Sequence, residues 1–119
     1  MPVLREAEVI DPKPAARIVN PDLMRIIAFE HDCCEVSGRV GSLHRHHLLF
    51  RSHGGDDVRA NILVLHDRLH EDYHRGDARA RALVGSHVRD HRPDFLLYLG
   101  DKLGPEAPHA WLTRHLTSS

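Results

Sequence analysis

The sequence predicts an α+β fold in a single domain, and three observations support this prediction. The chain has 119 residues, enough for one modest hydrophobic core. Its centre contains two short apolar runs bounded by turn residues, which is typical of strands, followed by a stretch of good helix formers. Beyond residue 76 the apolar residues have helical spacing, with breaker and capping residues between the segments.

The N-terminal part predicts an extended arm over residues 1–19. The single domain then covers residues 20–119 and is expected to begin with a helix. The arm contains Pro2, Pro12 and Pro14 and shows no sustained period. The run 20–22, Asn-Pro-Asp, offers a capping side chain, a proline for the first turn and an acid near the positive helix end. The apolar face of this helix is expected to hold Leu23, Ile26, Ile27 and either Phe29 or Glu30.

The centre, about residues 34–76, predicts the order strand, loop, strand, helix. The first strand lies in HRHHLLF, and the second is the run NILVL that opens on Asn61. The loop between them is the polar stretch RSHGGDD, and the helix HDRLHEDYH contains no Gly or Pro.

The C-terminal part, 78–116, predicts three helices. The first runs over 78–90, the second from Pro93 to Leu103 before Gly104, and a short last helix covers 110–116. The predicted core consists of Leu23, Ile27, Leu63, Leu65, Leu83, Leu96, Leu99 and Trp111.

Seven of the twelve histidines lie between residues 43 and 76. His70 and His74 are four apart, so a helix would place both imidazoles on one face, where they can bind one metal ion. His66 and His70 have the same spacing and are the alternative pair. Neighbouring strand residues face opposite sides, so His46 and His47 share a pocket only if the strand ends or bends there. Six further histidines are expected in solvent: His44, His53, His87, His91, His109 and His115.

Composition limits the possible environments and partners. The net charge of -1 does not favour strong nucleic-acid binding, although 14 of the 16 basic residues are arginines, the better phosphate donors. No apolar run is long enough for a membrane span and no signal peptide is evident, which predicts a cytoplasmic protein without a membrane partner. The adjacent Cys33 and Cys34 exclude a disulfide framework.

The order His-His, Arg-Ser-x-Gly-Gly-Asp, Asn-Ile-Leu-x-Leu, His-x-x-x-His resembles the HNH endonuclease family over about residues 34–76. The resemblance implies a ββα-metal finger, a two-stranded antiparallel hairpin plus a helix, here flanked by N- and C-terminal helices. It also implies a divalent-metal-dependent enzyme that hydrolyses DNA phosphodiester bonds and leaves 5′-phosphate products.

The same resemblance implies residue roles. His46, His70 and His74 would bind one divalent metal ion, and His47 would be the general base that activates water. Asn61 would orient His47 by holding its loop. Imidazole ligands do not reveal whether the metal is Mg, Mn, Ni, Co or Zn. The substrate-backbone candidates are Arg45, Arg51 and the weaker Arg75.

Two further expectations follow. Many family members hold a structural zinc, but the matching positions here read Cys34-x-x-Ser37 and His66-x-x-Leu69, an incomplete set unless His31 or Cys33 contributes. No structural zinc is therefore expected. The alternative function is a catalytically silent, metal-stabilised nucleic-acid or protein-binding module, against which His47 argues because it lies outside the ligand set. The near-neutral charge favours a protein partner that brings the chain to DNA.

Overall fold

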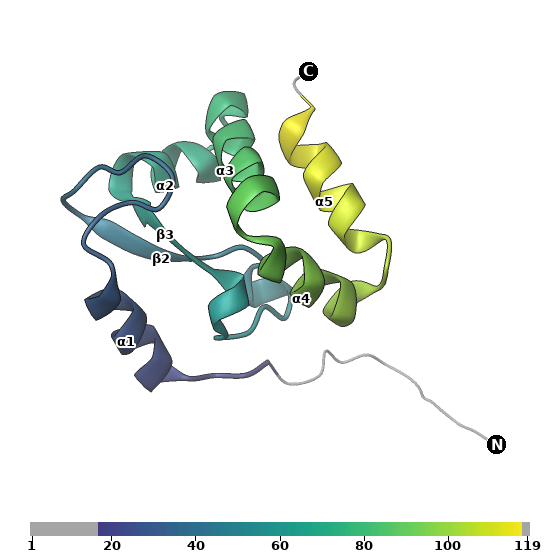
Figure 1. Ribbon diagram of the computed structural model, residues 1–119, viewed down its shortest axis with the longest axis horizontal. Coiled ribbons are helices and arrows are strands. Elements are labelled where there is room, and N and C mark those ends of the chain that lie inside the picture. The colour runs from purple at the N-terminus through teal and green to yellow at the C-terminus, as the bar shows by residue number, and fades with distance from the viewer. Residues whose placement is uncertain (1–16, 118–119) are drawn as a thin grey trace.

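The computed structural model describes residues 17–117 and has the expected α+β architecture (Figure 1). Within this range it contains one two-stranded antiparallel sheet, five α-helices and two single-turn 3-10 helices. Most of the predicted arm, residues 1–16, lies outside the described residues. The elements are α1 (Pro21–Glu30), β2 (Leu43–His47), η1 (Arg51–His53), η2 (Arg59–Asn61), β3 (Ile62–His66), α2 (Asp67–His74), α3 (Ala78–His91), α4 (Pro93–Leu103) and α5 (Ala107–Leu116).

The sheet is short, and its register places the histidine doublet at one end. His46 pairs with Leu63 and His47 pairs with Ile62, where β3 begins. The first four residues of β3 are buried, as expected for a strand covered on both faces. The alternation of β2 directs His46 toward α2, where its ring meets the ring of His70.

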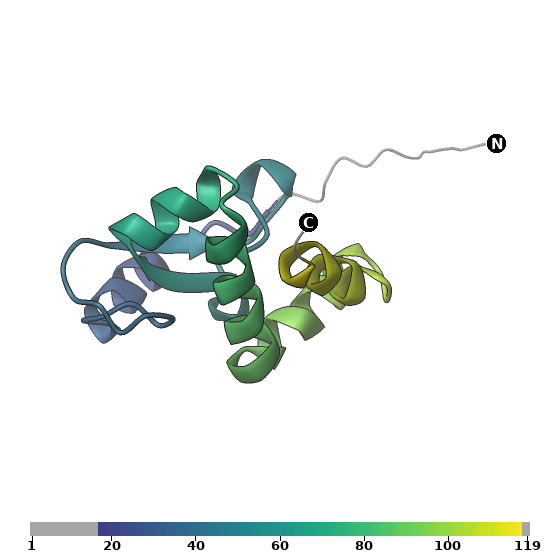
Figure 2. The same cartoon turned by 90° about the horizontal axis from the view of Figure 1, so that it is seen from above.

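Helix α3 lies between the sheet with α2 on one side and α5 on the other (Figures 1 and 2). Its buried residues Ala80, Val84 and Val88 form the middle of the core. Gly85 is also buried there. A Cβ atom at this position would lie 2.7 Å from the Cβ of His115, so glycine lets α3 and α5 approach closely. No helix among residues 17–117 has the length and apolar character needed to cross a bilayer.

The helix boundaries largely follow the local sequence signals. The Asn20 side chain caps α1 by accepting a hydrogen bond of 3.1 Å from the backbone N–H of Leu23. Helix α4 starts at Pro93 and ends before Gly104, as predicted. Helix α5 starts three residues earlier than predicted, because Pro108 occupies its first turn, where proline needs no N–H partner.

The predicted apolar faces were partly wrong. Ile27 is buried against Ile62 and Val64, but Phe29 is 91% exposed and Ile26 is 47% exposed. Leu83 in α3 is also exposed, at 43%. Each of these helices contacts the protein along a narrower stripe than its apolar pattern indicated, so the flanking apolar residues face solvent.

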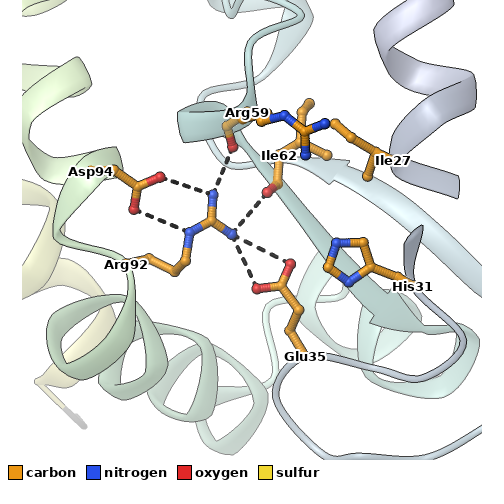
Figure 3. Close-up of a pocket in the computed structure, with 7 residues that line it drawn as sticks. All are labelled: Ile27, His31, Glu35, Arg59, Ile62, Arg92 and Asp94. Carbon is orange, nitrogen blue, oxygen red and sulfur yellow. Dashed lines mark hydrogen bonds and ion pairs between the residues drawn. The ribbon is translucent and has the colours of Figure 1, made fainter. Parts of the chain in front are cut away.

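Arg92, between α3 and α4, connects the C-terminal helices to the sheet (Figure 3). Its guanidinium forms ion pairs with Glu35 and Asp94, and its side chain is only 15% exposed. It also donates to the backbone carbonyls of Ile62 (3.0 Å) and Arg59 (2.7 Å). Glu35 and Asp94 are the two carboxylates of the pocket drawn in Figure 3, and Arg92 pairs with both. We therefore attribute a structural role to Arg92.

We expect Arg92→Ala to lower the free energy of unfolding by about 3 kcal/mol, because it leaves the largely buried Glu35 carboxylate without its cation. Urea unfolding followed by circular dichroism measures this change. The control is Arg89→Ala, which removes an exposed, solvent-screened pair with Asp90 and should leave the free energy of unfolding nearly unchanged. Equal losses in both variants would contradict the assigned role of Arg92.

Candidate functional site

Three histidines converge at the junction of β2 and α2. His46 comes from β2, and His70 and His74 come from successive turns of α2. One ring nitrogen of each lies within 4.8 Å of the others, and this is the one such histidine, cysteine or carboxylate group among residues 17–117. The Nε2 atoms of His70 and His74 are 3.1 Å apart. His46 is buried while His74 is exposed, so the cluster has a closed floor and an open side.

The buried member of this cluster fits a metal ligand. His46 is 2% exposed, and its Nε2 atom is buried without a hydrogen-bond partner in the described structure. Burial, and then the nearby His70 and His74, lower the pKa of His46 to about 3. Burial and His74 likewise lower the pKa of His70 to about 4. Both imidazoles are therefore neutral at pH 7, the form that binds a divalent metal ion.

The alternative pair, His66 and His70, is not formed. His66 is the N-cap of α2, and its Nδ1 accepts a 3.0 Å hydrogen bond from the backbone N–H of Arg68. A capping residue precedes the helix, so the i, i+4 rule does not apply to it. This role was missed because histidine is an uncommon cap.

The doublet meets the condition for sharing one pocket, because β2 ends at His47. Both histidines line an open pocket of about 370 Å³ together with His70 and His74. His47 turns away from the cluster, and its Nε2 lies 2.8 Å from Oδ1 of Asp57. Asp57 is 5% exposed and was not singled out from the sequence.

Asp57 determines which nitrogen of His47 can act as a base. Burial tends to raise the pKa of Asp57, but hydrogen bonds from Asn20, His47 and Arg17 outweigh it and lower the pKa to about 2. The carboxylate is thus ionised and only accepts hydrogen bonds. The Nε2 of His47 must therefore carry the hydrogen, which leaves Nδ1 of the neutral ring to accept a proton.

Asn61 closes the loop that contains Asp57. It is fully buried, accepts a 2.7 Å hydrogen bond from the N–H of Leu49, and donates to the carbonyls of Leu49 and Asp56. Gly55 lies inside this loop, where a Cβ atom would sit 1.7 Å from the carbonyl oxygen of Leu49. Asn61 therefore acts on the loop, one residue from the carboxylate that holds His47.

The three candidate arginines differ in position. Arg45 and Arg51 are exposed and line both the histidine pocket and a neighbouring pocket of about 370 Å³ on the other side of His47. Arg45 is anchored by a 2.8 Å hydrogen bond to the carbonyl of Met24 in α1. Arg75 instead caps the end of α2 and pairs with Asp72. It lines neither pocket, so the structure does not bring it to the site.

Three histidines were wrongly expected to be free in solvent. The side chain of His87 in α3 is only 14% exposed, and its buried Nε2 lies 3.5 Å from Glu35. The ring of His44 stacks on His70 with centroids 4.6 Å apart, and its Nε2 lies 2.7 Å from Asp67. His115 in α5 is 4% exposed, and its Nε2 is 2.6 Å from the hydroxyl of Tyr73, whose ring packs against His46. Position 115 is 42 residues from its partner, and no local pattern indicates the contact.

His115 should make the metal-free protein less stable in acid. Burial lowers its pKa to about 4, below the unfolded value of about 6.5. The unfolded chain therefore takes up the proton first, and stability present above pH 6.5 is lost as the pH falls toward 4. We expect His115→Gln to reduce the loss between pH 6 and 5 by about 1 kcal/mol.

Urea unfolding in EDTA at several pH values tests this, with the exposed His109→Gln as the control. An unchanged pH slope in His115→Gln would refute the expectation.

The residues considered for a structural zinc do not form a second cluster. Among residues 17–117, Cys34, His66, His31 and Cys33 do not gather three ligand atoms. Cys34 is 1% exposed, and its Sγ accepts a 3.3 Å hydrogen bond from the N–H of Ser37. His66 is used as a helix cap.

The chain matches no family model, and neither a curated protein nor a solved structure matches it significantly.

Proposed function

We propose that this protein is a metal-dependent endonuclease of the HNH type, which hydrolyses phosphodiester bonds of DNA. The observation that carries the proposal is the pairing of His47 with Asp57 beside the three-histidine cluster but outside it. A purely structural metal site has no use for a histidine that lines the same pocket and is held by a buried carboxylate. In this proposal the β2–β3–α2 unit is a ββα-metal finger.

The proposed chemistry divides the work between the cluster and His47. A divalent ion held by His46, His70 and His74 would supply positive charge next to the phosphate oxygens. His47 would accept a proton from the attacking water at Nδ1, while Asp57 holds the ring through Nε2–H. The exposed Arg45 and Arg51 would bind the flanking backbone, since arginine donates two parallel bonds to a phosphate.

The alternative, a silent metal-stabilised binding module, uses the same three histidines. It gives no role to the His47–Asp57 pair. Burying this pair costs desolvation free energy, and a structural metal site does not require it.

Nicking of supercoiled plasmid separates the two functions. Tag-free protein is assayed with Mg, Mn, Ni, Co and Zn in turn, with EDTA and a His47→Ala variant as controls. The proposal expects metal-dependent nicking that both controls abolish. Tight metal binding without nicking by any metal would reject the nuclease on duplex DNA and favour the binding module.

A further inference from the structure

A second pocket lies on the far side of the metal site, between the β2–β3–α2 unit and α5. It encloses about 200 Å³, and its floor is formed by the buried Leu48, Leu49 and Trp111. Phe50 lines this pocket and also the histidine pocket. The helices beyond the strands thus supply one wall of a cavity that adjoins the site.

The rim of this pocket is positively charged. Arg81 from α3 and Arg114 from α5 line it, and the nine lining residues include no carboxylate. Neither arginine forms an ion pair with any residue between 17 and 117. Arg81 lies over the ring of Tyr73, 5.3 Å from its centroid. This is unlike the pocket of Figure 3, whose arginines are all paired with acids.

The two arginines share one electrostatic environment. Arg114 lies beside His115 in the last turn of α5, and Arg81 lies over the ring of Tyr73, which stacks on the ring of His115. Two cations therefore face one cavity without a compensating acid, in a chain whose net charge is -1. An anionic ligand is the chemistry that this rim selects.

The pocket and the metal site are one aromatic side chain apart. The ring centroid of His46 lies 4.8 Å from that of Tyr73 and 6.0 Å from that of Phe50, and both of these rings line the second pocket. A strand whose phosphate reaches the histidine cluster would therefore bring a neighbouring nucleotide to the second pocket.

We propose that this pocket binds an unpaired nucleotide of the DNA strand, with its base on the apolar floor and its phosphate on Arg81 and Arg114. The inference rests on the proposed nuclease function, which supplies DNA as the substrate, and it adds which form of DNA is preferred. A duplex keeps its bases stacked inside and offers phosphates and groove edges to a protein surface. An apolar concave pocket is filled only by a base that has left the stack. The preferred substrate is then single-stranded or locally unpaired DNA.

Fluorescence anisotropy in EDTA tests this without strand cleavage, so the result does not depend on nuclease activity. Three fluorescein-labelled probes are used: a twelve-nucleotide oligothymidylate, a twelve-base-pair duplex, and an oligomer of twelve abasic tetrahydrofuran nucleotides. We expect wild-type protein to bind the oligothymidylate about tenfold more tightly than either other probe, because stacking of a base on aromatic side chains is favourable.

The Arg81→Ala/Arg114→Ala variant should lose about tenfold in oligothymidylate affinity. The slope of log K against log salt should shrink by about 0.7, because the one phosphate that both arginines contact is no longer neutralised. A merely structural role would not change this slope. The matched control is Arg79→Ala/Arg89→Ala, which removes two exposed charges from α3 outside the pocket and should alter neither quantity.

Three outcomes would overturn the proposal: no binding of the oligothymidylate, no preference for it over the duplex and abasic probes, or equal losses in the two double variants. If the Arg81→Ala/Arg114→Ala protein fails to fold by circular dichroism, Arg114→Ala alone is used, because this side chain is exposed. Plasmid nicking tests the nuclease separately, so oligonucleotide binding without nicking would reject only the nuclease.

Discussion

Asp57→Asn is expected to lower the rate of metal-dependent nicking by about 10²- to 10³-fold while metal binding is retained. The present carboxylate accepts from Nε2–H of His47 at 2.8 Å and thereby keeps Nδ1 free of hydrogen. An asparagine amide can instead donate to Nε2, which would move the ring hydrogen to Nδ1 and block the proposed base. Single-turnover nicking measures the rate, and calorimetric titration measures the metal affinity.

The neighbouring Asp56→Asn is the matched control. Asp56 is as buried as Asp57, and its carboxylate pairs with Lys102 at 2.8 Å and accepts from Tyr98, so its loss also costs stability. It does not contact His47. Equal loss of nicking in the two folded variants would mean that Asp57 acts through the loop and not through the ring of His47.

If the three-histidine cluster binds a divalent metal ion as proposed, His46→Leu is expected to remove the thermal stabilisation that the metal would give. At a free metal concentration of about 100 Kd, wild-type protein gains about 2.7 kcal/mol, which raises Tm by roughly 10 °C. The metal-free variant should be at least as stable as wild type, because leucine replaces a buried imidazole whose Nε2 lacks a partner. Thermal scans with and without Ni or Zn measure both quantities in tag-free protein.

His109→Leu serves as the control, since this histidine is exposed on α5 and outside the cluster. It should keep the full metal shift. A His46→Leu protein that still responded to metal would show that ions bind elsewhere, and a strongly destabilised metal-free variant would show that His46 supports the fold itself.

Local rules predicted the features that depend on neighbours in sequence. The i, i+4 spacing placed His70 and His74 on one face, and Asn20 and Pro93 marked helix starts that the structure contains. The end of β2 at His47 was given only as a condition in the sequence, because a bend after a short strand depends on the loop that follows.

Features set by tertiary contacts could not be predicted. Asp57 lies in a Gly-Gly-Asp-Asp turn, where a carboxylate that holds a histidine looks the same as one that faces water. The burial of His115 depends on Gly85 in another helix, which leaves room for its Cβ atom. The exposure of Leu83 and Phe29 likewise depends on how widely each helix is covered.

Asn61 and Gly55 are needed for the loop to fold, whereas His46 and His47 are needed only for the proposed site. Any side chain at position 55 would collide with the Leu49 carbonyl, and loss of the Asn61 amide would leave buried backbone groups unpaired. In a library of random variants selected only for solubility, we therefore expect Gly55 and Asn61 to persist, while position 46 accepts apolar side chains of similar size such as leucine. The residues that tolerate least change are thus not the ones that would perform the reaction.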